Sequence, residues 1–266
     1  MNSFPERYGP WAVVAGASVG IGAEFCRQLA AEGVNVVAVS RSAGKLEALT
    51  AELRAEHGVE TRVAAVDLAA PGAEAELFAA TDGLEIGLLV YNAGADSLNT
   101  WFLGVPPKEW HGMVRRNCVV PLLAAHRYGA EMAERGHGGV LLVTSGAAWA
   151  GGARLTTYGA TKAFDLVFAE GLWAELRRDG VDVLALVVGA TDTPALRASL
   201  ERFGATADGL ADPADVAREG LTHLGDGPTW QVGVPDGAGP SLLGALPRRQ
   251  AVELMTQGHD ALFGEH

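Results

Sequence analysis

Short apolar segments alternate with longer stretches of helical periodicity along most of this chain. Seven runs rich in valine have the length of single strands; they cover residues 11–15, 34–40, 61–67, 86–92, 138–145, 181–188 and 229–234. The segments between them carry apolar residues at helical spacing; they cover residues 20–32, 42–56, 71–81, 106–136, 158–178 and 213–224. Strands that are apolar on both faces and alternate with helices are typical of a parallel sheet covered on both sides by helices.

This alternation predicts an α/β fold with a doubly wound parallel sheet of about seven strands, the three-layer arrangement called Rossmann-type. Right-handed crossovers in such a sheet leave a crevice at the carboxyl ends of the strands, where ligands bind. No linker divides the pattern, so we expect residues 1–266 to form one domain. Two segments are not explained by the alternation of strands and helices. Residues 193–210 are predicted as a lid or as a pair of surface helices, and the C-terminal extension, residues 235–266, contains an amphipathic helix at 247–263.

Composition and charge narrow the partners that this chain can have. The formal net charge is −12, and repulsion from phosphates would oppose binding to nucleic acid. Residues 1–10 lack the pattern of a signal peptide and no apolar run is long enough to cross a bilayer, so we expect a cytoplasmic protein without a membrane span. Cys26 and Cys118 are expected to be separate thiols, and no histidine or cysteine cluster has metal-site spacing, so no metal is predicted.

A glycine-rich turn follows the first predicted strand and opens the first long helix. Its residues include Gly16, Ser18, Gly20, Ile21 and Gly22. Glycines let the backbone approach a pyrophosphate closely, and the helix N-terminus supplies free N–H groups and the positive end of the helix dipole. Such turns also serve packing alone, but the position after the first strand of a doubly wound sheet favours a dinucleotide site.

The residues at the end of the second predicted strand indicate which of the two nicotinamide dinucleotides, NAD or NADP, the chain binds. A site for NAD uses a carboxylate here to bind the adenosine ribose, whereas a site for NADP uses a cation for the 2′-phosphate. No acidic residue occurs in positions 34–46, and Arg41 offers a guanidinium fork between the hydroxyls of Ser40 and Ser42. Arg41 could also be a solvated arginine at a strand end, but the missing acid favours NADP.

Tyr158 and Lys162 are one helical turn apart and therefore share a helix face. An ammonium beside a phenol lowers the pKa of the phenol, and in the reduction direction the tyrosine would donate its proton to a developing alkoxide. Taken alone, such a pair is usually an exposed feature of a helix. Ser145 favours the chemical interpretation, because it ends the fifth predicted strand at the ligand-binding edge, where its hydroxyl could bond the substrate oxygen.

Two asparagines complete the candidate set. Asn92, followed by Ala93 and Gly94, ends the fourth predicted strand at the same edge of the sheet. Asn117 lies inside the helix that follows, where asparagine is mildly unfavourable. Asn117 is therefore expected either to have a functional role or only to cap or kink that helix.

In this order and spacing, the glycine turn, the Asn-Ala-Gly motif and the four residues Asn117, Ser145, Tyr158 and Lys162 resemble the single-domain branch of the short-chain dehydrogenase/reductase family. The resemblance covers roughly residues 10–235. It implies a catalytic tetrad in which Tyr158 is the acid/base and Ser145 orients the substrate carbonyl. In that tetrad Lys162 would hold ribose hydroxyls and tune Tyr158, while Asn117 would anchor a water in a proton relay.

The resemblance also implies that Asp67 and Leu68 contact adenine and that Thr193, after Gly189, holds the nicotinamide carboxamide. Taken together, the predicted cofactor contacts are Gly16, Ser18, Gly20, Ile21, Gly22, Ser40, Arg41, Asp67, Leu68, Asn92, Ala93, Gly94, Tyr158, Lys162, Gly189 and Thr193. Two positions depart from the family pattern. Ala15 stands where the glycine motif usually begins with threonine, and Val188 stands where a proline usually precedes Gly189.

These residues predict an NADP-dependent oxidoreductase that transfers a hydride between the nicotinamide and the carbonyl or secondary alcohol of an apolar small molecule. The alternative is a non-catalytic protein that senses or binds NADP, which would need the glycine turn but no intact tetrad. The substrate pocket is expected from residues 95–103, 146–157 and 193–210. These segments supply Trp101, Trp149, Leu155, Leu196, Leu200 and one cation, Arg154.

The predicted helix at 158–178 is apolar on two sides. The stripe expected to face the sheet contains Phe164, Val167, Phe168 and Leu172, and the other contains Leu166, Ala169 and Trp173. A helix apolar on more than one face is usually buried on more than one face. The family likeness places a two-fold interface at this helix and at residues 106–136, so we expect a homodimer, with a homotetramer as the alternative. The C-terminal extension is expected either to cover the edge of the last strand or to close over the pocket.

Overall fold

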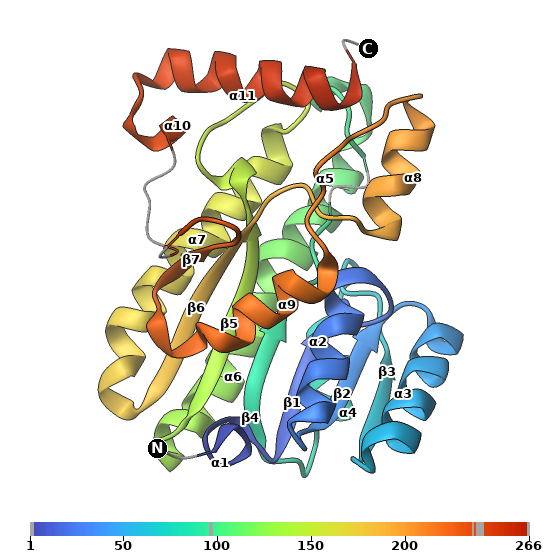
Figure 1. The fold of residues 1–266 in the computed structure, drawn as a ribbon, viewed down its shortest axis with the longest axis vertical. Coiled ribbons are helices and arrows are strands. Elements are labelled where there is room, and N and C mark those ends of the chain that lie inside the picture. The colour runs from blue at the N-terminus through green and yellow to red at the C-terminus, as the bar shows by residue number, and fades with distance from the viewer. Residues whose placement is uncertain (1–2, 96–97, 236, 238–241, 265–266) are drawn as a thin grey trace.

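The computed structural model describes residues 3–95, 98–235, 237 and 242–264, and these residues form one seven-stranded parallel sheet. The strands are β1 (Trp11–Ala15), β2 (Asn35–Ser40), β3 (Thr61–Ala65), β4 (Ile86–Tyr91), β5 (Gly138–Ser145), β6 (Val181–Val188) and β7 (Thr229–Gln231). Their spatial order is β3-β2-β1-β4-β5-β6-β7, and every pairing is parallel (Figure 1). The predicted doubly wound fold is thus confirmed, with its change of winding direction between β1 and β4.

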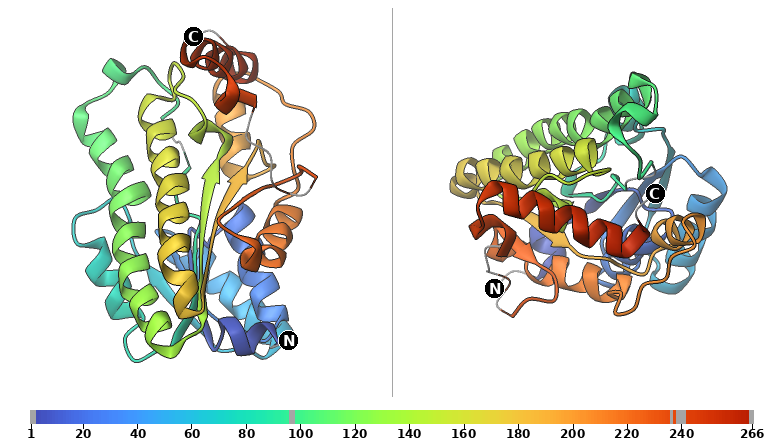
Figure 2. Two further views of the ribbon diagram at one scale, coloured as in Figure 1. Left: turned by 90° about the vertical axis from the view of Figure 1, so that its left-hand side faces the viewer. Right: turned by 90° about the horizontal axis from the view of Figure 1, so that it is seen from above.

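Helices cover both faces of the sheet (Figure 2). One layer contains α2 (Gly20–Ala31), α3 (Ala43–His57) and α9 (Pro213–Thr222), and the other contains α4 (Ala73–Ala80), α5 (Pro107–Val114), α6 (Val120–Arg135) and α7 (Thr156–Leu176). Each layer buries its own apolar cluster against the sheet. The valine-rich strands suit this position because successive residues such as Val13 and Val14 face opposite layers, and both are fully buried.

The predicted helix at 106–136 is divided in the structure into three parts. Between α5 and α6 the segment η2 (Arg115–Val119) has π-helical hydrogen bonding, in which the Val120 amide donates to the Arg115 carbonyl. Pro121, in the first turn of α6, has no amide to donate to the carbonyl of Asn117, so the regular ladder cannot pass this point. The sequence placed Asn117 in a helix, and the structure places it in this irregular segment.

The predicted assignment of the two apolar stripes on α7 was wrong in part: Phe168 and Leu172 do pack against the apolar cluster on the sheet side, but Val167 does not. Leu166 and Ala169 face the sheet and are buried, whereas Val167 is 64% exposed. The physical reason is the position of Lys162, which is also buried on the sheet side of α7. Residues four and seven positions after it lie on the same helix face and must therefore face the sheet as well.

The chain ends in helices that lie above the carboxyl ends of the strands. The segment predicted as a lid contains α8 (Pro194–Arg202), and the C-terminal extension contains α10 (Leu242–Ala245) and α11 (Arg248–Phe263). Figures 1 and 2 show α11 crossing the top of the molecule over this edge of the sheet, so it closes over the pocket rather than covering β7. Within the described residues, no helix combines the length and apolar character that a membrane span requires.

Smaller differences lie at the ends of elements. The first helix, α1 (Phe4–Tyr8), and α10 were not predicted. The last strand, predicted to residue 234, ends at Gln231 because the chain then turns back, and the Gln231 amide donates to the Gly237 carbonyl at 3.1 Å.

Candidate active site

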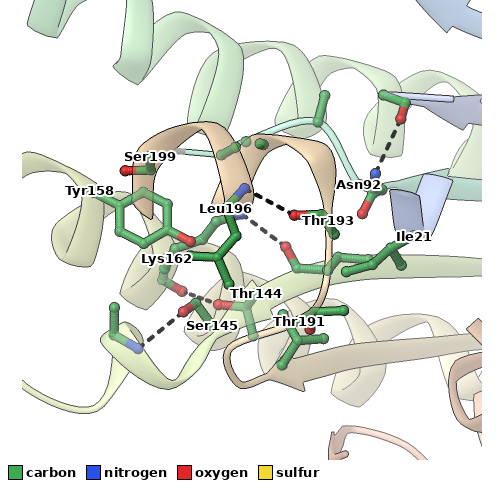
Figure 3. A pocket seen from close by; sticks show the side chains of 18 of the residues that line it. Ile21, Asn92, Thr144, Ser145, Tyr158, Lys162, Thr191, Thr193, Leu196 and Ser199 are labelled. Carbon is green, nitrogen blue, oxygen red and sulfur yellow. Dashed lines mark hydrogen bonds between the residues drawn. The ribbon is translucent and has the colours of Figure 1, made fainter. Parts of the chain in front are cut away.

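A cavity of about 770 Å³ lies at the carboxyl edge of the sheet, beneath α8 and α11. The segments that follow β1 to β6 all contribute to its lining, which explains why residues far apart in the sequence meet there. The predicted site residues that line it are Gly16, Ser18, Ile21, Ser40, Arg41, Asp67, Leu68, Asn92, Ala93, Gly94, Ser145, Tyr158, Lys162, Gly189 and Thr193. Figure 3 shows the central part of this group.

The glycine turn joins β1 to α2 and is tied to the next strand of the sheet. The Asn92 side chain at the end of β4 donates from Nδ2 to the Gly16 carbonyl at 3.2 Å. A Cβ at Gly22 would lie 2.1 Å from the Gly16 carbonyl oxygen, so only glycine allows this close approach. Gly20 and Gly22 are absent from the cavity lining defined by the described residues, and a Cβ at Gly20 would lie 3.0 Å from Cγ2 of Thr193.

The end of β2 supplies the cationic corner of the cavity. Arg41 is exposed and lines the cavity together with Ser40 and Ser42. The Ser42 amide donates to Ser40 Oγ at 3.2 Å, which fixes the turn around Arg41. Within the described part of the chain, no side chain pairs with the guanidinium, so its donors can reach a ligand.

Tyr158, Ser145 and Lys162 meet at the middle of the cavity. Ser145 ends β5, and its Oγ accepts a hydrogen bond from the Ala147 amide at 3.2 Å. Tyr158 lies in the first turn of α7, with its hydroxyl directed toward the cavity on the side of Ser145 and Lys162 (Figure 3). The Lys162 ammonium reaches in from the same helix and donates to the Val143 carbonyl at 2.9 Å.

The Lys162 ammonium is packed closely against the Asn-Ala-Gly segment after β4. A Cβ on Gly94 would lie 2.7 Å from Lys162 Nζ, so a larger residue at this position would displace the lysine. Lys162 Nζ also donates to Asp165 Oδ2 at 3.1 Å, which forms a buried ion pair. Burial raises the pKa of Asp165 and the Lys162 ammonium opposes that rise.

Asn117 is fully buried and is not among the residues that line the cavity in the described part of the chain. Its Nδ2 donates to Thr161 Oγ1 at 2.9 Å and more weakly to the Gly94 carbonyl at 3.4 Å. The Thr161 hydroxyl in turn donates to the Tyr158 carbonyl at 2.8 Å. Through Thr161, Asn117 therefore braces the first turn of α7, which carries Tyr158.

The part of the cavity beneath α8 and α11 is apolar. Of the side chains predicted for this pocket, Leu155 and Leu196 line it. Trp101, Trp149 and Leu200 are missing from the described lining, and Arg154 is turned away to pair with Asp260 of α11. The sequence places these aromatic and basic side chains in loops near the pocket. A position in a loop does not reveal the direction in which the side chain points.

Sequence reasoning missed the side chains that α11 supplies. Leu254, Met255, Gly258, His259, Leu262 and Phe263 line the apolar end of the cavity. The amphipathic pattern of residues 247–263 identified the helix but not the surface on which it packs. Sequence reasoning also missed Asp165, although a carboxylate three positions after a functional lysine on the same helix face is a readable signal.

The residues that follow β1 and β2 fit a nicotinamide dinucleotide. The closely approached glycine turn at the N-terminus of α2 leaves room for a pyrophosphate beside free amide groups. The guanidinium of Arg41 and the hydroxyls of Ser40 and Ser42 form a donor set suited to a phosphate, and positions 34–46 contain no carboxylate that would repel it.

A parallel sheet wound in two directions, with a glycine turn after β1 and a Tyr-x-x-x-Lys helix at its carboxyl edge, defines a class of nucleotide-dependent oxidoreductases. The family model for short chain dehydrogenases matches residues 10–202, and this chain belongs to that family, the short-chain dehydrogenases/reductases. The family relationship predicted from the motifs is therefore confirmed.

The similar proteins include hydroxysteroid dehydrogenases and other members of the family. The chain is 37% identical over 195 residues to the 7β-hydroxysteroid dehydrogenase of Collinsella aerofaciens, covering 73% of this chain and 74% of that protein. A solved structure that accompanies a study of 7β-hydroxysteroid dehydrogenase stereoselectivity superimposes with a TM-score of 0.87 at 31% identity, covering 96% of this chain and 99% of the other. A short-chain dehydrogenase from Sphingobium yanoikuyae in complex with NADPH gives a TM-score of 0.75 at 26% identity, covering 92% of this chain and all of the other.

Proposed function

We propose that this chain is an NADP-dependent oxidoreductase that interconverts a ketone and a secondary alcohol on a bulky, apolar, ring-containing small molecule. One observation carries the proposal: the same cavity is lined by Arg41 after β2, by Tyr158 and Ser145, and by apolar side chains of α11 such as Phe263. A dinucleotide placed along the first half would bring its reactive ring to these two hydroxyls.

The preference for NADP is supported by the end of β2. Arg41 is the exposed cation there, and a guanidinium binds phosphate oxygens through two hydrogen bonds at once. The Sphingobium yanoikuyae neighbour, which is related in sequence and fold, was solved with NADPH. Of the remaining predicted contacts, Gly16, Asp67 and Thr193 line the same cavity as Arg41.

The chain's own groups would handle the proton and the substrate oxygen. The Tyr158 hydroxyl would donate its proton to the substrate oxygen during reduction and take it back during oxidation. The Ser145 hydroxyl would bond the same oxygen and hold it beside Tyr158. NADPH, when bound, supplies the hydride that completes the reduction.

The proposed substrate class follows from the apolar end of the cavity. Leucine, methionine and phenylalanine side chains from α8 and α11 line it, and such a surface favours a large hydrocarbon body over a sugar or a phosphorylated metabolite. The 7β-hydroxysteroid dehydrogenase relative acts, by its name, on a rigid multi-ring alcohol. A steroid or a compound of similar shape is therefore the first substrate class to test.

The direct test is NADPH consumption by the purified chain with aliphatic, aromatic and steroid ketones, together with NADPH binding measured separately. We expect NADPH binding and turnover with ring-containing ketones, and loss of turnover with retained binding in Tyr158→Phe. NADPH binding without turnover in either direction across the panel would instead support the non-catalytic alternative.

A further inference from the structure

The roof helix α11 carries a glycine in its interior. Gly258 lies more than one turn from either end of the helix, which covers Arg248–Phe263. Glycine in such a position makes a helix less stable than alanine would, because it loses more backbone freedom on folding. The backbone itself does not require glycine here, since Gly258 is not one of the residues with a positive φ. The missing side chain therefore calls for an explanation outside the helix.

Packing against neighbouring elements does not require a glycine at position 258 either. Apart from the helix's own backbone and the two chain neighbours, a Cβ there would meet no atom of the described residues within 4 Å. Gly152 gives the contrast, because a Cβ on Gly152 would lie 2.8 Å from Cγ of Met255. Gly152 is thus needed to seat α11 on the loop after β5, whereas a side chain on Gly258 would have open space in front of it.

The open space in front of Gly258 belongs to the cavity. Gly258 lines the cavity, and so do Leu254 and Leu262, which lie one turn before and one turn after it on the same face of α11. Met255 and His259 line the cavity beside this row. The glycine therefore leaves a gap between two leucines at the apolar end of the cavity.

Contacts on both sides of Gly258 hold α11 in its place above the sheet. Before the glycine, Met255 lies closely against Gly152 of the loop after β5. After the glycine, His259 Nε2 is hydrogen-bonded to Asn99 Oδ1 of the loop after β4. Because α11 is fixed in this way, the helix does not move inward to close the gap, and the gap stays open to a ligand.

We propose that Gly258 is a specificity-determining residue, and that the gap at Gly258 receives part of the hydrocarbon body of a bulky substrate. Filling the gap would remove apolar surface of both partners from water and restore close packing along α11. A small ketone has no such body to place there. The inference rests on the proposed function and adds to it the residue of the roof that admits large substrates.

A graded pair of substitutions tests the role of Gly258. Gly258→Ala fills the gap in part and Gly258→Leu fills it further, and both residues favour a helix more than glycine does. We expect kcat/KM for a steroid ketone to fall by about tenfold or more in Gly258→Leu, mainly through KM, and by less in Gly258→Ala, because one methylene in an apolar pocket changes discrimination by about 10- to 200-fold. For cyclohexanone, kcat/KM should stay within about twofold of the natural chain.

Gln257→Leu is the matched control. Gln257 is the neighbour of Gly258 on α11, but it is exposed and is not among the described residues that line the cavity. A leucine there should leave the turnover of both ketones unchanged. Thermal unfolding should show that the two Gly258 variants are at least as stable as the natural chain. If a folded Gly258→Leu turns over the steroid ketone as well as the natural chain does, the proposal is overturned.

Binding of Nile red, a flat and apolar fused-ring dye, gives a reading that does not depend on turnover. Its fluorescence should give a Kd about tenfold higher for Gly258→Leu and an unchanged Kd for Gln257→Leu. An unchanged Kd for Gly258→Leu overturns the role of Gly258. Dye binding without turnover of any carbonyl or alcohol would refute the proposed function alone, because the Kd values would still decide the role of Gly258. A natural chain that binds neither the dye nor a ring-containing ketone would overturn both.

Discussion

The two ends of the cavity are held in place by different means. At the cofactor end, the lining belongs to the turns that directly follow buried strands, and the Asn92–Gly16 hydrogen bond joins two of these turns. At the substrate end, the roof is α11, which is attached through side chains to loops far away in the sequence. Arg154 pairs with Asp260 and donates to the Gly264 carbonyl at 2.8 Å.

The other attachments of α11 are of the same kind. His259 Nε2 bonds Asn99 Oδ1, and the Ala153 amide donates to Thr256 Oγ1 at 3.0 Å. Asn99 and Arg154 both have left-handed backbone conformations, with φ of 44° and 61°. Such angles are uncommon for an arginine and are better tolerated by an asparagine.

Because the two ends are built differently, members of one family can keep their chemistry while their substrates change. Alterations at the cofactor end would disturb the strands and the close backbone contacts that form it. Exchanges among the side chains of the roof would move α11 and reshape the apolar end without disturbing the sheet. The cofactor site and the substrate site should therefore respond separately to mutation.

The largest effect on turnover is expected from a substitution at Tyr158, where the two ends of the cavity meet. Tyr158→Phe removes the proton donor and should lower turnover by about 10²–10⁴ while NADPH affinity stays nearly unchanged. Steady-state kinetics and NADPH titration measure the two quantities. Tyr128→Phe is the control, because Tyr128 is buried away from the cavity and bonds Thr81, and it should retain activity. Substantial turnover in Tyr158→Phe would refute the assigned role.

The next largest effect should be confined to the cofactor end. Arg41 is expected to supply about 1.5–3 kcal/mol of the preference for NADPH over NADH through charge-assisted hydrogen bonds. Arg41→Asp should reverse the preference, because a carboxylate repels the 2′-phosphate and accepts from a ribose hydroxyl. Titration of both cofactors into both proteins measures this. Equal affinities in the natural chain would show that Arg41 does not select the cofactor.

A smaller effect should appear at the substrate end alone. Arg154→Ala breaks the attachment of α11 to the pocket rim and should lower kcat/KM by about three- to tenfold, mainly through KM, because the roof offers apolar contacts but no reacting group. NADPH affinity should not change, and hydrogen exchange of α11 amides should become faster. Arg249→Ala removes an exposed arginine from α11 and serves as the control. A loss of cofactor affinity in Arg154→Ala would contradict the separation of the two ends.

We expect the chain to form a dimer, and a substitution that disrupts the dimer should leave both ends of the cavity unchanged. Val167 on α7 and Leu122 on α6 remain exposed, together with Val114 and Val119, on the side of the molecule away from the sheet. Light scattering should give the mass of two chains, and Val167→Asp should give the mass of one. Leu103→Asp changes an exposed residue elsewhere and should leave the dimer intact. A single-chain mass for the natural protein would refute the interface, and a four-chain mass would show that a second interface exists, so that the C-terminal extension does not block further assembly.

The sequence determined the sheet, the order of its elements and the identity of the residues at its carboxyl edge. This was possible because strand ends and tight turns have local signatures: valine runs, the glycines at 16, 20 and 22, and a tyrosine and lysine one turn apart. In a doubly wound sheet the segments that follow the strands all lie at the carboxyl edge, and this does not depend on the side chains in other parts of the chain. Ser145, Tyr158 and Lys162 could therefore be predicted to meet.

The roof of the pocket, the orientation of α7 and the pairing of Lys162 with Asp165 became visible only in the folded structure. The amphipathic pattern of residues 247–263 says that one face of a helix is buried but not against what, and α11 could equally have covered β7. The apolar stripes of α7 could be assigned to either side, because both contain large aliphatic and aromatic residues. These outcomes depend on contacts between residues distant in the sequence, and a periodicity within one segment carries no information about its partner.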